Sequence, residues 1–142
     1  MRIVIGSDHA GFPLKASIVE LVKSLGHAVE DVGSHTPDPV DFPDIARLVT
    51  GAVADGRPER GLLVCGTGVG AYFAANKVKG IRAAVCHDIH SAHQCVEHDD
   101  VNVMCIGAQI VGPWLAKDLV SAYLVAEFST DEDFRRRVRK LA

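Results

Sequence analysis

The 142-residue sequence predicts an α/β domain in which a five-stranded parallel sheet is covered by helices on both faces. Short apolar runs alternate with helical patterns, and most of these runs are apolar at every position, as buried parallel strands are. The length suits one domain, and an apolar fraction of 48% supplies its core. We therefore expect one three-layer domain over residues 1–142.

The first half of the chain contains three expected strands. A β-branched run at 2–6 ends at Gly6, an alternating segment covers 27–33, and an apolar run covers 62–65. Between them, one helix has Pro13 in its first turn and stops at Gly26, and a second covers 43–54 after a polar, proline-rich loop at 34–42. This order of elements is a repeated strand–helix unit.

The second half continues the alternation. Strands are expected at 81–86 and 103–106, and helices at 71–78, 91–98, 113–128 and about 130–141. The last helix carries its acidic residues first and its basic residues last, which suits the helix dipole. The expected result is a five-stranded sheet with a short basic amphipathic helix at its end.

Net charge and cysteine content argue against several classes of protein. Fifteen Lys and Arg against eighteen Asp and Glu give a net charge of -3, which argues against a nucleic-acid binder. The four cysteines form no Cys-x-x-Cys pair, so we expect reduced, mostly buried thiols in a cytoplasmic protein. No signal peptide and no apolar stretch of about eighteen residues is present, so no membrane association is expected.

Ligands of open parallel sheets bind at the carboxyl ends of the strands, which here places the loops 7–11, 34–42, 66–70, 87–90 and 107–112 at the expected site. The most informative loop contains Gly66, Thr67, Gly68, Val69 and Gly70, directly after a strand and before a helix. Its glycines let backbone N–H groups converge on an anionic oxygen. A tight turn that needs glycine only for packing is the alternative.

The same loop also fits a relaxed dinucleotide-binding pattern, with Ala71 in the third position and Asp88 as a ribose acceptor. A nucleotide-binding module is therefore the competing function class. The pattern follows the third strand rather than the first, which disfavours it.

Cys65 immediately precedes this loop, where N–H dipoles could activate its thiol as a base or nucleophile. An inert buried thiol is the alternative, and it is the expectation for Cys86, Cys95 and Cys105.

Histidines and charged residues supply the other candidates. His87, His90 and His93 have a spacing that only weakly suggests a metal site, and none is expected. His98 ends a helix beside Asp99, where an imidazole could move protons near neutral pH.

Asp8 and His9 follow the first strand and could bind sugar hydroxyls or an anion, or serve as a helix cap and a surface histidine. The arginines of the last helix could bind a phosphate or form a solvated face. They are Arg135, Arg136, Arg137 and Arg139.

Six segments together resemble the type B ribose-5-phosphate isomerases and the related galactose-6-phosphate isomerase subunits. They are Gly6–Phe12, Asp41–Pro43, Cys65–Gly70, Ala75–Lys77, Gly80–Ala83 and Glu97–Asn102, and they span nearly the whole chain. The resemblance implies a Rossmann-like α/β/α sandwich and an aldose–ketose isomerase of the pentose phosphate pathway. It also implies a homodimer or homotetramer with active sites shared between chains, and no cofactor or metal.

Carried over residue by residue, the resemblance implies that Cys65 is the base that moves a proton between C1 and C2 of the sugar. The backbone of Gly66, Gly68, Val69 and Gly70 would hold the enediolate oxygen, with Thr67 supporting the loop. His98 would assist opening of the furanose ring.

The implied substrate-binding residues are Asp8 for sugar oxygens, His9 and Arg137 for the phosphate, and Asp99 beside the ring-opening histidine. Three positions depart from the family pattern: Asp99 stands where Asn is common, and Gln109 and Asp133 stand where arginines are common. An unphosphorylated or differently sized aldose, such as ribose or allose, is therefore an alternative substrate.

Overall fold

The computed structural model describes all 142 residues and contains five strands and six helices. The strands are β1 (Arg2–Ser7), β2 (Ala28–Asp31), β3 (Arg60–Cys65), β4 (Ala83–Val85) and β5 (Val103–Gly107). The helices are α1 (Phe12–Ser24), α2 (Phe42–Ala54), α3 (Val69–Ala75), α4 (Ile89–Asp99), α5 (Pro113–Val125) and α6 (Glu132–Arg139).

All strand pairs are parallel, and their order across the sheet is β2-β1-β3-β5-β4. The expected fold class is confirmed. Because the strands run the same way, the loops that follow them meet at one edge, and the register places Ser7 beside Val64 and Cys65 beside Gly107. This carboxyl edge carries all five loops that the sequence singled out, because each of them follows a strand.

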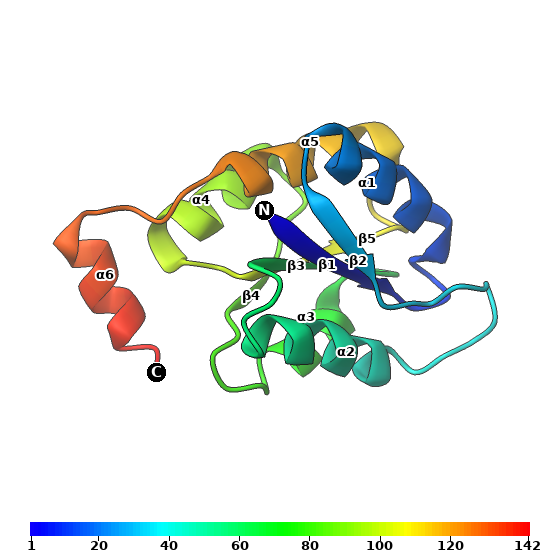
Figure 1. Cartoon of the computed structure of the whole chain (residues 1–142), viewed down its shortest axis with the longest axis horizontal. Coiled ribbons are helices and arrows are strands. Elements are labelled where there is room, and N and C mark those ends of the chain that lie inside the picture. The colour runs from blue at the N-terminus through cyan, green and yellow to red at the C-terminus, as the bar shows by residue number, and fades with distance from the viewer.

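Helices cover both faces of the sheet, as Figure 1 shows, with α1, α4 and α5 on one side and α2 and α3 on the other. Alternate strand residues divide between these layers: Ile3 and Ile5 pack toward α1 and α5, whereas Val4 packs toward α2. Proline near the start of α1, α2 and α5 supports their first turns, where its missing N–H costs nothing.

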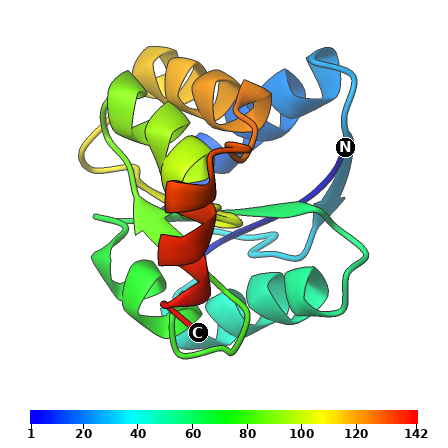
Figure 2. The same ribbon diagram turned by 90° about the vertical axis from the view of Figure 1, so that its left-hand side faces the viewer.

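Helix α6 stands apart from the two layers and packs against α4 at one end of the molecule (Figures 1 and 2). It contains no buried residue, and Asp131 caps its first turn by accepting a hydrogen bond from the Asp133 N–H at 2.8 Å. The basic helix expected at the end of the chain is thus present, as a projecting arm. No helix in the structure combines the length and apolarity that crossing a membrane requires.

Helices α3 and α5 differ from the expected bounds by up to three residues. Helix α3 covers Val69–Ala75 rather than 71–78, because Gly68 in the left-handed region (φ 85°) starts it early. It ends before Asn76, whose side chain accepts a hydrogen bond from the Ala83 N–H at 2.9 Å and donates one to the Ala83 carbonyl at 3.0 Å. Helix α5 ends at Val125 rather than 128, because the Arg60 guanidinium donates to the carbonyls of Tyr123 and Ala126.

Candidate active site at the carboxyl edge of the sheet

Cys65 is the last residue of β3, and its side chain is buried with only 6% exposed. Its Sγ accepts a hydrogen bond from the Gly68 N–H at 3.0 Å. Gly68 can direct its N–H back at the sulfur because it adopts a left-handed conformation that glycine tolerates without strain. The thiol and the glycine loop therefore form one unit.

The rest of the loop leaves backbone donors available. The N–H groups of Gly66, Thr67 and Gly70 make no hydrogen bond within the chain, whereas the Thr67 Oγ1 accepts from the Val69 N–H at 3.3 Å. Free donors at the start of a helix, beside a thiol, are suited to stabilising negative charge on a bound oxygen.

Two glycines from other parts of the chain hold the Cys65 segment from both sides. A Cβ on Gly11 would lie 2.0 Å from the Val64 carbonyl oxygen, and one on Gly107 would lie 2.6 Å from the Gly66 carbonyl oxygen. Backbone therefore packs directly against backbone at both positions. This clamp was not predicted from the sequence, where its only signals are a glycine just before α1 and a glycine at the end of β5.

Asp8 and His9 lie at the same edge, in the loop after β1. The Asp8 carboxylate is mostly buried and its Oδ1 accepts the Gly11 N–H at 2.9 Å, so it holds the loop that contacts Val64. His9 is exposed, and its Nδ1 accepts the Val40 N–H at 3.2 Å. Asp8 is not the α1 cap, because that helix starts at Phe12 after Gly11.

Three further side chains contact this site and were not assigned to it from the sequence. The Phe42 ring lies against Gly70, where an added Cβ would meet it at 2.8 Å. The Gln109 carboxamide lies against Gly66 in the same way, at 3.2 Å, and its backbone N–H donates to the Gly66 carbonyl at 3.0 Å. The His87 Nε2 accepts the Gly107 N–H at 2.9 Å.

His98 and Asp99 lie at the opposite edge of the sheet. They end α4, and the chain then enters β5 at Val103, four residues before Gly107, the neighbour of Cys65. At about 3.3 Å per residue, β5 alone spans about 13 Å between these edges. A single chain does not bring His98 and Cys65 together.

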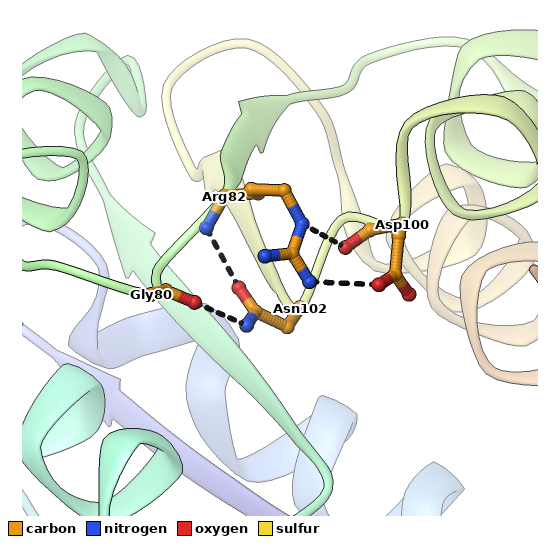
Figure 3. Close-up of polar contacts among 4 residues, drawn as sticks. All are labelled: Gly80, Arg82, Asp100 and Asn102. Atoms are coloured by element: carbon orange, nitrogen blue, oxygen red, sulfur yellow. Dashed lines mark hydrogen bonds and ion pairs between the residues drawn. The ribbon is translucent and has the colours of Figure 1, made fainter. Parts of the chain in front are cut away.

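A polar network fixes the turn after His98 (Figure 3). The Arg82 guanidinium donates to the Asp100 carbonyl at 2.7 Å and to its carboxylate at 2.8 Å. The Asn102 side chain accepts from the Arg82 N–H and donates to the Gly80 carbonyl. Asp100 adopts a left-handed conformation at the end of α4, so the network stabilises a turn that few residues favour.

His98 contacts the projecting helix. Its ring stacks on the Phe134 ring of α6, with the two centroids 3.9 Å apart. The Arg137 guanidinium lies over the same Phe134 ring, 5.6 Å from its centroid. Asp133 pairs with Arg136 at 2.7 Å, and Glu132 pairs with Arg139, whereas Arg137 has no acidic partner. Arg135 is also without an acidic partner but lies over the Phe128 ring, whereas Arg137 lies over the Phe134 ring on which His98 stacks.

The remaining histidines and thiols do not form a metal site. No group of three or more His, Cys, Asp or Glu side chains is arranged to hold an ion. His93 pairs with Glu97 at 3.1 Å, while His87 bonds the backbone. All four cysteines are free and buried, as expected. Burial raises the pKa of Cys105, and a hydrogen bond to Cys95 together with burial raises that of Cys86.

Comparisons with known proteins agree on one relationship. A family model described as ribose/galactose isomerase matches residues 3–141. The chain is 42% identical to the D-erythrulose-4-phosphate isomerase of Pectobacterium atrosepticum, over 90% of this chain and 85% of that protein. It is 44% identical to ribose-5-phosphate isomerase B of Escherichia coli, over 89% of this chain and 85% of that protein.

A solved structure of a similar protein has the same fold. The ribose-5-phosphate isomerase B of Clostridium thermocellum superposes with a TM-score of 0.96 and is 45% identical, covering 99% of this chain and 95% of that one. The Rossmann-like α/β/α arrangement implied by the sequence motifs is therefore confirmed.

Proposed function

Because this chain belongs to the ribose/galactose isomerase family, we propose that it interconverts ribose 5-phosphate and ribulose 5-phosphate through an enediolate. The observation that carries the proposal is the 3.0 Å contact between the Cys65 Sγ and the Gly68 N–H, which joins a proton acceptor to a loop of free backbone donors. An aldose–ketose shift needs these two parts and no redox cofactor. Family membership favours this chemistry over the nucleotide-binding alternative.

In the proposed reaction, Cys65 as the thiolate removes the proton from C2 of the open-chain aldose. The electron pair moves toward the carbonyl oxygen at C1, and the N–H groups of Gly66, Thr67 and Gly70 stabilise the negative oxygen. The hydroxyl proton passes from O2 to O1 of the enediolate, and Cys65 returns its proton to C1, which leaves a carbonyl at C2, gives the ketose and restores the thiolate. Asp8 is proposed to hold a sugar hydroxyl, and His9 and Arg137 to hold the phosphate.

The site is proposed to form between two copies of the chain. His98 is proposed to assist ring opening, yet it lies at the edge of the sheet opposite Cys65. A second chain that supplied His98, Asp99 and Arg137 from its α4 and α6 would complete the site. Helix α6 projects from the body with no buried residue, as an arm that packs on a partner would.

The surface near the glycine loop supports the same assembly. Val69, Tyr72 and Phe73 of α3 are exposed apolar residues, and they line a groove of about 770 Å³ along the edge strand β4. Asp99 also lines this groove. An apolar groove that reaches from the loop beside Cys65 to the region of His98 is well placed to hold a second copy.

The substrate is tested with a panel of sugars. Ketose or aldose formation is measured with ribose 5-phosphate, D-erythrulose 4-phosphate, galactose 6-phosphate and the free sugars ribose and allose. We expect the highest kcat/KM with ribose 5-phosphate. A preference for another phosphorylated sugar would reassign the substrate, a preference for free sugars would support the unphosphorylated alternative, and no turnover of any sugar would refute the isomerase.

The shared site is tested by complementation. Cys65→Ser and His98→Ala chains, each inactive alone, are co-expressed and purified together. A mixed dimer contains one site with both native residues, so activity should return. The matched control is the Cys65→Ser/His98→Ala double variant co-expressed with Cys65→Ser, which should stay inactive. Inactive mixed dimers would mean that the two residues do not meet across an interface.

A further inference from the structure

His87 occupies the loop between β4 and α4 and has no part in the proposed proton transfer. Its half-buried ring directs Nε2 at the backbone N–H of Gly107, at 2.9 Å. Gly107 is the last residue of β5 and lies beside Cys65 in the sheet register. The histidine therefore fixes the strand end that adjoins the candidate base.

Gly107 packs directly against the glycine loop, so the position of Gly107 determines the position of that loop. An added Cβ on Gly107 would lie 2.6 Å from the Gly66 carbonyl oxygen and 2.7 Å from the Thr67 Cα, so no side chain separates the two segments. The next two residues of the chain bond the same segment, with Ala108 N–H donating to the Cys65 carbonyl at 2.7 Å. A shift of Gly107 would displace the donors of Gly66 and Thr67.

The imidazole is suited to this role only as a neutral ring with a bare Nε2. Burial lowers the pKa of His87, which favours that form, while the neighbouring Asp88 acts in the opposite direction. Asp88 is engaged elsewhere, because its carboxylate caps α4 by accepting from the Ser91 N–H at 2.8 Å and the Ser91 hydroxyl at 2.7 Å. The remaining proton of the neutral ring must then be on Nδ1.

We propose that His87 is a positioning residue of the isomerase site, whose Nε2 holds Gly107 and thereby sets the backbone donors of Gly66 and Thr67 at the spacing that the enediolate oxygen requires. This inference rests on the proposed function, because it assigns those donors to the oxyanion. Such donors act mainly in the transition state, so a displaced loop should lower kcat more than it raises KM.

Three variants separate this role from simple packing. His87→Leu removes the acceptor and should lower kcat about 10-fold with KM changed less than about twofold, a smaller loss than deletion of an oxyanion donor itself causes. His87→Gln places an oxygen acceptor at a similar reach and should restore kcat to within about threefold of the wild type. His90→Leu is the matched control and should not change kcat. His90 lies in the first turn of α4, is exposed, and its side chain makes no hydrogen bond.

Two measurements do not depend on turnover. In the wild type, ¹⁵N NMR should identify His87 as the Nδ1–H tautomer, and amide exchange at Gly107 should become faster in His87→Leu but stay slow in His87→Gln. A wild type that converts no sugar would refute the proposed function, while these data would still show whether His87 holds the strand end.

The inference is overturned by an Nε2–H tautomer, by wild-type kcat in His87→Leu, or by equal kcat losses in the Leu and Gln variants. If His87→Leu does not fold, His87→Asn, whose side chain is too short to reach Gly107, replaces it with the same expected loss.

Discussion

The carboxamide of Gln109 lies across the Cα of Gly66, so close that a Cβ on this glycine would meet it at 3.2 Å. Gln109 is exposed, and its side chain forms no hydrogen bond within the chain. It therefore presents a neutral donor and acceptor beside the backbone donors that adjoin Cys65. An arginine at this position would present a cation in the same place.

Gln109→Arg should lower KM for a sugar phosphate about three- to tenfold and leave KM for a free sugar unchanged, because charge-assisted hydrogen bonds to phosphate are stronger than neutral ones. Gln109→Glu should raise KM for the sugar phosphate by repulsion. Steady-state kinetics with ribose 5-phosphate and ribose checks both. Parallel changes for the two sugars would show that residue 109 does not face the phosphate.

Cys65→Ser should lower kcat by about 10²-fold or more with the fold intact, as expected on loss of a general base. Cys86→Ser is the control: that thiol is also buried, but its raised pKa keeps it protonated and it lies outside the glycine loop. Activity and the thermal midpoint are measured for both variants. Equal activity losses would mean that the effect reports thiol packing rather than proton transfer.

Arg137→Ala should raise KM for a sugar phosphate about tenfold or more with little change in kcat, because a hydrogen bond to a charged group contributes about 1.5–3 kcal/mol. Arg136→Ala should change it little, because Arg136 is already paired with Asp133 at 2.7 Å. Kinetics with the phosphorylated and the free sugar are compared. If Arg137→Ala leaves KM for the phosphate ester unchanged, the phosphate is bound elsewhere.

The stability of the fold should fall in mild acid, and His87 should contribute to this fall. Burial lowers the pKa of folded His87 below the ordinary histidine value of about 6.5, so the unfolded chain binds a proton more readily than the folded one. The unfolding free energy should therefore decrease as the pH drops below about 6.5, until the folded pKa is passed. His27, whose pKa is also lowered by burial, should act in the same direction.

Urea unfolding at pH 8, 6.5 and 5 measures this dependence. His87→Gln should lose less stability between pH 6.5 and pH 5 than the wild type does, since glutamine does not titrate. Identical pH dependence in the two proteins would assign the acid sensitivity to His27 and other groups.

The sequence was sufficient to predict the elements whose causes are local. The apolar runs became strands, and Pro13 and Pro43 lie where their helices begin. The end of α5 could not be predicted, because Arg60, more than sixty residues earlier in the chain, binds the carbonyls of Tyr123 and Ala126. The placement of β5 between β3 and β4 is likewise a long-range result.

The same distinction applies to the candidate site. Cys65 and the glycine loop are contiguous in sequence, so their chemistry could be predicted from one motif. The contacts of His87 with Gly107 and of Gln109 with Gly66 join segments about twenty and forty residues apart, and only the strand pairing brings them together. The stack of His98 on Phe134 depends on how α6 folds back onto α4.

Gly11 and Gly107 pack without side chains against the two sides of the segment that carries Cys65. For the evolution of this protein, every missense change at either codon adds at least a Cβ where the neighbouring backbone leaves no room. Substrate preference can therefore change by substitution at exposed positions such as Gln109, whereas Gly11 and Gly107 tolerate almost no substitution. A search for functional residues by chemical reactivity would pass over both, although they are among the positions where this site tolerates least change.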